Sequence, residues 1–394
     1  MKSTVYPAVV LTLLTLASCQ HMPSQWVLSK PQALLVEESL FNGQSYPVET
    51  VNEIFGLPQQ TKKELKTILA AHSGITERST AILHYILAHT GDNFNYDLLQ
   101  TRTVKETLAQ RQANCLSLSI LTYSIAREIG IDAAFQDIKI PEYWSSQNNQ
   151  TWLSGHVNVK LRQSNRLDYI TGVVQLGNDI IVDFDPNVIR QRFAAETITP
   201  ARVAAMFYNN KAAESFAQKN YAQTYRYYRA AIAIDPSFAL TWSNLGVLYR
   251  QQNLLLLAEQ VYHHSLALDP SSANTLANLA VLYRFQGNNS AAAELEQRVH
   301  RKRQTNPWYY LMLGNEAVKR HNPDAAIGFF QQSLAINARM HEALFGLARS
   351  YFDLNNHDKA MYYLDKSRRV AKTTEDKQRY QNKISALSRV ANAG

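Results

Sequence analysis

The segment Asn114–Gly130 reads NCLSLSILTYSIAREIG, and after the cysteine nearly all of its side chains are apolar or small hydroxyls. This composition predicts a helix that is buried on most sides, with Asn114 as its N-cap and Gly130 just past its last turn. Cys115 then occupies the first helical position, where the positive end of the helix dipole favours a nucleophilic thiolate. We therefore expect this end of the helix to face a cleft.

The chain has 394 residues, of which 46% are hydrophobic and 18% charged, so we expect two or three globular domains. Its net charge is +8, but lysine and arginine are dispersed and cluster only at Arg301-Lys302-Arg303. We interpret that cluster as a solvated helix end. Dispersed charge argues against nucleic-acid binding. We expect no cofactor and no bound metal.

Residues 1–18 have one lysine and an apolar run from Val9 to Leu16, which is the layout of a secretory signal peptide and too short to span a membrane. The next motif, Leu16-Ala17-Ser18-Cys19, resembles the bacterial lipobox. That resemblance implies a lipid anchor on Cys19, and a cleaved signal without lipid is the alternative. Because Gln20 follows and not aspartate, the resemblance to Gram-negative sorting implies an outer-membrane lipoprotein that faces the periplasm.

Residues 19–47 carry scattered proline and serine, and they predict a tether that leads from this anchor. Residues 48–200 predict an α+β domain, because helical patterns come first and alternating strands follow. Two of the expected strands are His156–Leu161 and Ile180–Pro186. Residues 141–155 predict a polar loop, whose Trp144 and Trp152 either line an acyl-binding groove or pack on the edge of the domain.

A catalytic thiol needs a neighbouring base and a group that orients the base. His156 is the best candidate base, because it follows a glycine and lies on the polar face of an alternating strand. Asp183 and Asp185 are two residues apart on a later strand, so both point to one face and either could orient the imidazole. Each residue alone is more often structural, but together they favour a triad.

The order of cysteine on a helix, histidine on a strand and aspartate on a later strand resembles the transglutaminase-like branch of the papain-like cysteine enzymes, over residues 100–190. In that family the aspartate commonly precedes a proline, as Asp185 does here, so the resemblance assigns the orienting role to Asp185 first and to Asp183 in reserve. It implies attack of Cys115 on an amide carbonyl, with His156 as proton carrier. Water as the acceptor gives a peptidase or amidase, and an amine gives a crosslinking enzyme.

Residues 205–374 repeat with a period of 34 residues, in five copies that start at Ala205, Ala239, Ala273, Pro307 and His341. The second copy resembles the tetratricopeptide repeat at Trp242, Leu245, Gly246, Tyr249, Ala258, Tyr262 and Pro270. Such helical hairpins stack into an all-α solenoid with a concave surface. We expect a protein or peptide partner on that surface, where Arg250 and Arg284 either bind a carboxylate or are solvated. Residues 375–394 predict a capping helix.

These observations predict an α+β transglutaminase-like domain followed by a tetratricopeptide-repeat solenoid. The expected function is that of an envelope-anchored cysteine enzyme that acts on amide bonds and recruits a partner through its repeats. The alternative is a catalytically silent scaffold or assembly lipoprotein, in which only the solenoid matters.

Overall fold

The computed structural model describes residues 31–41, 46–71, 75–90, 95–96, 100–110, 112–147, 150–162, 179–184, 193–371 and 373–391. The expected signal peptide, the candidate lipid anchor Cys19 and the candidate orienting residue Asp185 lie outside these residues, so they stay predictions.

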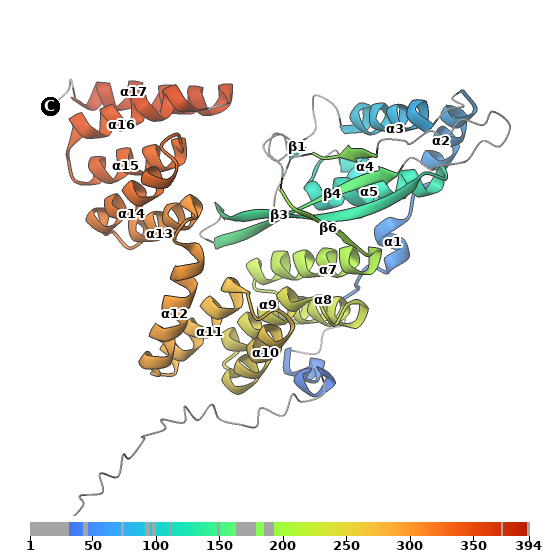
Figure 1. Ribbon diagram of the computed structural model, residues 1–394, viewed down its shortest axis with the longest axis horizontal. Coiled ribbons are helices and arrows are strands. Elements are labelled where there is room, and N and C mark those ends of the chain that lie inside the picture. The colour runs from blue at the N-terminus through green and yellow to red at the C-terminus, as the bar shows by residue number, and fades with distance from the viewer. Residues whose placement is uncertain are drawn as a thin grey trace, which may run out of the picture.

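Helical elements precede the main sheet in the chain. They are η1 (Pro31–Leu34), η2 (Glu38–Phe41), α1 (Val51–Phe55), α2 (Gln59–Ala71), α3 (Ile75–Thr90), α4 (Val104–Gln110) and α5 (Cys115–Glu128), and of these α1 to α5 lie close to the sheet (Figure 1). Helix α5 matches the expected cysteine helix, because Asn114 caps it and Gly130, with φ of +75°, lies just past its end. Its apolar side packs on the sheet, where the ring of Tyr123 stacks on that of Phe135 at 4.3 Å.

Among the described residues, the main sheet has four antiparallel strands in the order β5-β4-β3-β6, which confirms the α+β arrangement. Its strands are β3 (Asp132–Gln147), β4 (Gln150–Arg162), β5 (Ile180–Val182) and β6 (Ala195–Ile198). A separate parallel pair joins β1 (Asn95–Tyr96) to β2 (Gln112–Ala113). Phe135, Val159 and Val182 lie in one row across three strands and are almost fully buried.

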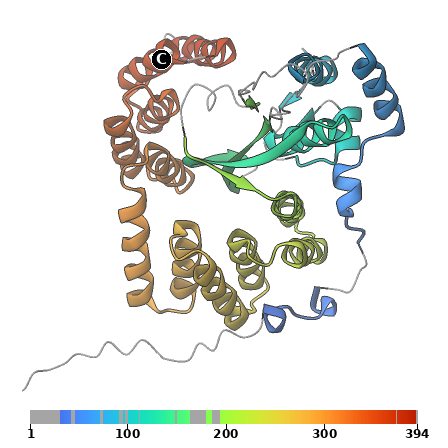
Figure 2. The same cartoon turned by 45° about the vertical axis from the view of Figure 1, so that its right-hand side comes forward.

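The prediction of a polar loop over residues 141–155 is wrong. Most of this segment is strand, and β3 and β4 continue through it as one long hairpin. The prediction failed because Pro141 and the polar residues around it are disfavoured in the interior of a sheet. Beyond Ile138 the hairpin leaves the sheet and runs as a two-stranded arm to the repeats (Figures 1 and 2). Proline and polar residues are tolerated in this arm because it is not an interior part of the sheet.

The remaining helices form pairs that curve around the tip of this arm (Figure 2). They are α7 (Pro200–Ala217), α8 (Tyr221–Ile234), α9 (Ala239–Gln251), α10 (Leu255–Leu268), α11 (Ala273–Phe285), α12 (Asn289–Arg303), α13 (Pro307–Lys319), α14 (Pro323–Ile336), α15 (His341–Asp353), α16 (His357–Val370) and α17 (Thr374–Ala391). Four helices begin at the expected repeat starts 239, 273, 307 and 341. The first, α7, begins five residues before 205, because Thr199 caps it and Pro200 suits its first turn.

Glycines let the two helices of the second repeat, and those of the fourth, approach closely. A Cβ atom on Gly246 would lie 2.5 Å from the ring of Tyr262, and one on Gly314 would lie 2.4 Å from the ring of Phe330. Both aromatic side chains are fully buried. The glycine and aromatic positions of the repeat pattern therefore meet in space, which explains why they recur together in sequence.

The expected tether is packed where the structure describes it. Phe41 of η2 stacks on Tyr225 of α8 at 4.5 Å. The hydroxyl of Tyr225 donates to the carbonyl of Val36, and that of Tyr249 donates to the carbonyl of Leu34. Residues 31–41 thus lie on the first two repeats, held by contacts with residues about 190 and 215 positions further along the chain.

Candidate functional site

The start of α5 is held by a network of buried hydrogen bonds. The side-chain oxygen of Asn114 accepts from the backbone N–H of Ser117 and from its hydroxyl, both at 2.9 Å. The amide nitrogen of Asn114 donates to Thr101, and the hydroxyl of Ser117 accepts from the backbone of Arg102. The network fixes the first turn of the helix, so Cys115 has a defined position while its side chain keeps partial access to solvent.

His156 is 98% buried on β4, and its Nε2 lies 2.9 Å from each carboxylate oxygen of Asp183. Strand pairing explains the contact: Val159 pairs with Val182, the last residue of β5, so Asp183, which follows it, comes opposite Asn158. Alternation puts His156 on the same face as Asn158. The amide nitrogen of Asn158 also donates to Asp183, at 3.0 Å.

The electrostatics of His156 favour the protonated imidazole. Burial alone would lower the pKa of His156, but the hydrogen bonds to Asp183 and Cys115 outweigh burial and raise the pKa to about 10. An ionised carboxylate only accepts hydrogen bonds, so Nε2 carries the proton toward Asp183. The other ring nitrogen, Nδ1, is then the one available for the hydrogen bond with the thiol of Cys115.

Helix and strand are joined directly beside this site. The hydroxyl of Ser119, one turn after Cys115, donates to the carbonyl of Val157 at 3.0 Å, and Ser119 is fully buried. This bond connects α5 to the residue that follows His156. The thiol and the imidazole are therefore carried by a helix and a strand that are bonded to each other.

The structure brings together Cys115, His156 and Asp183, which was the reserve choice for the orienting aspartate. The first choice, Asp185, lies outside the described residues. Sequence reasoning missed Asn158, although its place two residues after His156 on the polar face was a usable signal. The three residues can hold a thiol next to a charged imidazole, which is the arrangement that nucleophilic catalysis requires. Across the described ranges, no three His, Cys, Asp or Glu side chains gather as a metal site.

The two candidate arginines of the concave face already have contacts within the repeats. Arg284 forms a two-point ion pair with Glu296 of α12, with nitrogen–oxygen distances of 2.7 and 3.0 Å. Arg250 contacts Tyr262, and its Nε is buried without a hydrogen-bond partner. Binding of a partner carboxylate at Arg284 would compete with Glu296.

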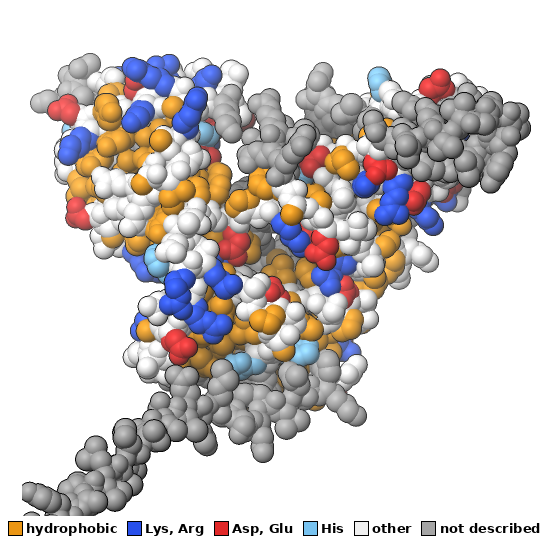
Figure 3. Space-filling model, in the orientation of Figure 1, with side chains coloured by type: hydrophobic (Ala, Val, Ile, Leu, Met, Phe, Trp, Pro, Cys, Tyr) orange, Lys and Arg blue, Asp and Glu red, His pale blue; other side chains and the backbone are white. Residues whose placement is uncertain are grey.

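Of the two alternatives for Trp144, a groove lining or packing at the edge of the domain, the structure shows packing, against residues of the repeats. The guanidinium carbon of Arg303 lies 4.7 Å from the ring centroid of Trp144, and Tyr309 lies 6.4 Å from it. The side chain of Trp152 lies outside the described part of the chain. Arg303 itself is 95% buried, so the expectation that Arg301-Lys302-Arg303 is a solvated helix end is wrong for its last member. Arg301 and Lys302 are exposed, and Figure 3 shows lysine and arginine gathered over α12.

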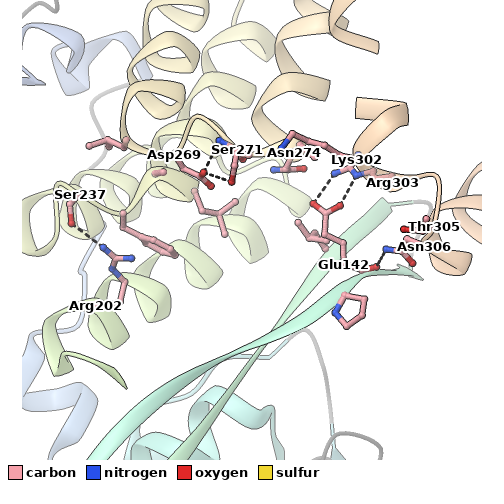
Figure 4. Close-up of a pocket in the computed structure, with 18 of the residues that line it drawn as sticks. Glu142, Arg202, Ser237, Asp269, Ser271, Asn274, Lys302, Arg303, Thr305 and Asn306 are labelled. Carbon is pink, nitrogen blue, oxygen red and sulfur yellow. Dashed lines mark hydrogen bonds and ion pairs between the residues drawn. The ribbon is translucent and has the colours of Figure 1, made fainter. Parts of the chain in front are cut away.

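A cavity of about 940 Å³ lies between the hairpin arm and the repeats (Figure 4). Glu142 and Leu153 line it from the arm, while Arg202, Lys302 and Arg303 line it from the repeats. Cys115, His156 and Asp183 are not part of its wall. The cavity and the thiol site are therefore separate features of the described structure.

The tetratricopeptide repeat family matches this chain over residues 272–305 and 311–372. Similar solved structures include the MamA protein, at 20% identity and a TM-score of 0.27, with 42% of this chain and 91% of MamA covered. Pseudomonas aeruginosa pilF is 18% identical with a TM-score of 0.31, and the match covers 48% of this chain and 90% of pilF. Yeast Tom70 is 15% identical with a TM-score of 0.35, and the match covers 48% of this chain and 40% of Tom70. No curated protein matches. The C-terminal helices are therefore a tetratricopeptide-repeat solenoid, a module for protein interaction.

In the portion that the structure describes, no helix combines the length and the apolar character needed to cross a membrane.

Proposed function

We propose that the protein combines partner binding through its repeats with thiol-dependent acyl transfer at Cys115. The observation that carries the enzymatic part is the contact of His156 with both oxygens of Asp183, beside a capped cysteine helix. The raised pKa of His156 places a positive charge beside Cys115, and a positive charge beside a cysteine favours nucleophilic chemistry at its sulfur. The resemblance to transglutaminase-like enzymes supports the same assignment.

In the proposed reaction, the sulfur of Cys115 bonds to the carbonyl carbon of an amide and forms a tetrahedral intermediate. The Nδ1–H of His156 then gives its proton to the nitrogen, the carbon–nitrogen bond breaks and a thioester remains. Water or an amine attacks the thioester, His156 takes the proton back, and the carbon–sulfur bond breaks to restore the thiolate. The free N–H groups of the first turn of α5 suit the developing oxyanion, and each such donor contributes about 3 kcal/mol.

We further propose that Cys19 carries a lipid and places the protein on the periplasmic face of the outer membrane. The lipobox resemblance supports this, and mass spectrometry of the mature N-terminus tests it. A diacylglyceryl mass on Cys19 that is absent from Cys19→Ala is the expected result, and an unmodified cleaved N-terminus would refute it.

The second candidate is a scaffold lipoprotein in which the site is silent. The match of the repeats to a protein-interaction family favours this function independently of Cys115. The two candidates differ in what Cys115→Ala does to cells. The enzyme requires the thiol, so this variant should behave like a deletion. The scaffold requires only the solenoid, so the variant should behave like the wild type while disruption of the repeats abolishes function.

A further inference from the structure

The hairpin is interrupted directly beside His156. The ladder between β3 and β4 pairs Ile138 with His156 and resumes only where Tyr143 pairs with Ser154. Four residues of β3, 139–142, therefore face the single residue Gly155 of β4. This bulge bends the hairpin, and His156 occupies the last ladder position before it.

Within the described residues, backbone support from neighbouring strands ends at the start of the bulge, where the N–H of Lys139 donates to the carbonyl of Ala194 at 2.8 Å. Strand β5 pairs with residues 159–161 of β4, and β6 pairs with residues 135–138 of β3. The arm is therefore a two-stranded ribbon, and an isolated two-stranded hairpin is marginally stable in water. Its position must depend on whatever its side chains contact.

Those contacts converge on Arg303 at the end of α12 (Figure 4). Its guanidinium binds both carboxylate oxygens of Glu142, at 2.6 and 2.9 Å, and lies over the ring of Trp144. Asn306 donates to the backbone carbonyl of Glu142 at 2.6 Å, and its own oxygen caps α13 at Trp308. The bulge next to His156 is thus held through the side chain of Glu142, through the backbone carbonyl of Glu142 and through the ring of Trp144.

We infer that Arg303 is a positioning residue for the thiol site, because it fixes the bulge and so places the imidazole of His156 against Cys115. This inference rests on the proposed acyl-transfer function. Under this inference the third repeat supports the thiol site, because Arg303 at the end of α12 holds the arm in place. A planar guanidinium that binds two oxygens and stacks on an indole defines orientation more strictly than a lysine would.

The test measures two quantities in the full chain without residues 1–19. The first is the rate of Cys115 alkylation by iodoacetamide as a function of pH. The second is hydrogen exchange of the backbone amides of residues 150–158. The variants are Arg303→Gln, Glu142→Gln, the double variant that combines these two changes, and Arg303→Lys. Arg229→Gln is the matched control, because it removes another long-range Arg–Glu contact, to Glu38 at 2.8 Å, that lies away from the arm.

We expect Arg303→Gln and Glu142→Gln to slow alkylation at pH 7 about tenfold and to speed exchange in residues 150–158. The double variant should be no slower than either single variant, because both remove the same contact. Arg303→Lys should recover part of the rate, and Arg229→Gln should behave like the wild type. If Arg303→Gln does not fold, Glu142→Gln removes the contact from its more exposed side.

Two results would overturn the inference. One is a wild-type thiol that reacts quickly near neutral pH and keeps that rate in both variants. The other is exchange at residues 150–158 that is the same in Arg303→Gln, Arg229→Gln and the wild type. If the wild-type thiol reacts as a free cysteine does, the proposed function fails, and hydrogen exchange alone then decides whether Arg303 positions the arm.

Discussion

Nε2 of His156 lies 2.9 Å from both carboxylate oxygens of Asp183, and the two side chains are 98% and 94% buried. A buried carboxylate is costly unless it is paired, and here it accepts from the imidazole and from Asn158. The pair therefore stabilises a positively charged imidazole that can also form a hydrogen bond with the side chain of Cys115.

Replacement of Asp183 by asparagine should lower the pKa of His156, because the negative charge that favours the imidazolium is lost. Less thiolate would then form, and alkylation of Cys115 at pH 7 should slow at least tenfold, with its pH midpoint moved upward. Asp179→Asn is the matched control, since Asp179 also flanks β5 but pairs with Lys160. Equal alkylation rates in both variants would remove Asp183 from the site.

Stability should depend on pH through the same contact. The folded pKa of His156 is raised to about 10 from an ordinary value of about 6.5, so its contribution is fully present below pH 6.5 and is lost as pH rises toward 10. The free energy of unfolding of the wild type, measured relative to Asp183→Asn, should therefore fall between pH 6.5 and pH 10. Urea denaturation at several pH values measures this difference. A constant difference would contradict the raised pKa.

Loss of the cap on α5 should cost more than loss of an exposed cap. Asn114 is 96% buried and its side chain makes three hydrogen bonds, one to Thr101 and two to Ser117, so Asn114→Ala should lower the free energy of unfolding by about 2 kcal/mol. Asn288 caps α12 at an exposed position, and Asn288→Ala should cost about 0.5–1 kcal/mol. Denaturant titration gives both values. Equal losses would mean that the network around Asn114 adds nothing beyond the cap.

Two glycines of the fourth repeat should respond to alanine in opposite directions. Gly328 has open space around a new Cβ, so Gly328→Ala should stabilise its helix by about 0.5–1 kcal/mol. A Cβ on Gly314 would meet the Phe330 ring at 2.4 Å, so Gly314→Ala should destabilise the solenoid by about 1–3 kcal/mol. Thermal unfolding followed by circular dichroism distinguishes them. A stabilising Gly314→Ala would show that the ring moves aside freely.

Local patterns in the sequence predicted the repeats and α5. The contact between Gly246 and Tyr262 lies within a single repeat, and Asn114 caps the helix that directly follows it. Alternation around His156 also predicted its strand. The features that were missed depend on contacts between distant residues. Arg303 contacts Glu142, 161 positions away, and residues 31–41 lie on tyrosines about 190 positions further along the chain. A strand can pass through Pro141 because the arm lies outside the interior of the sheet.

Thiol-dependent catalysis is tested most directly by the alkylation rate of Cys115 against pH, in the protein without residues 1–19 and in its His156→Ala variant. We expect rapid alkylation at neutral pH, with a midpoint well below the value of about 8.5 for a free cysteine, and loss of that reactivity in His156→Ala. A midpoint near 8.5 that His156→Ala does not change would contradict the enzymatic function and leave the repeats as the working part of the protein.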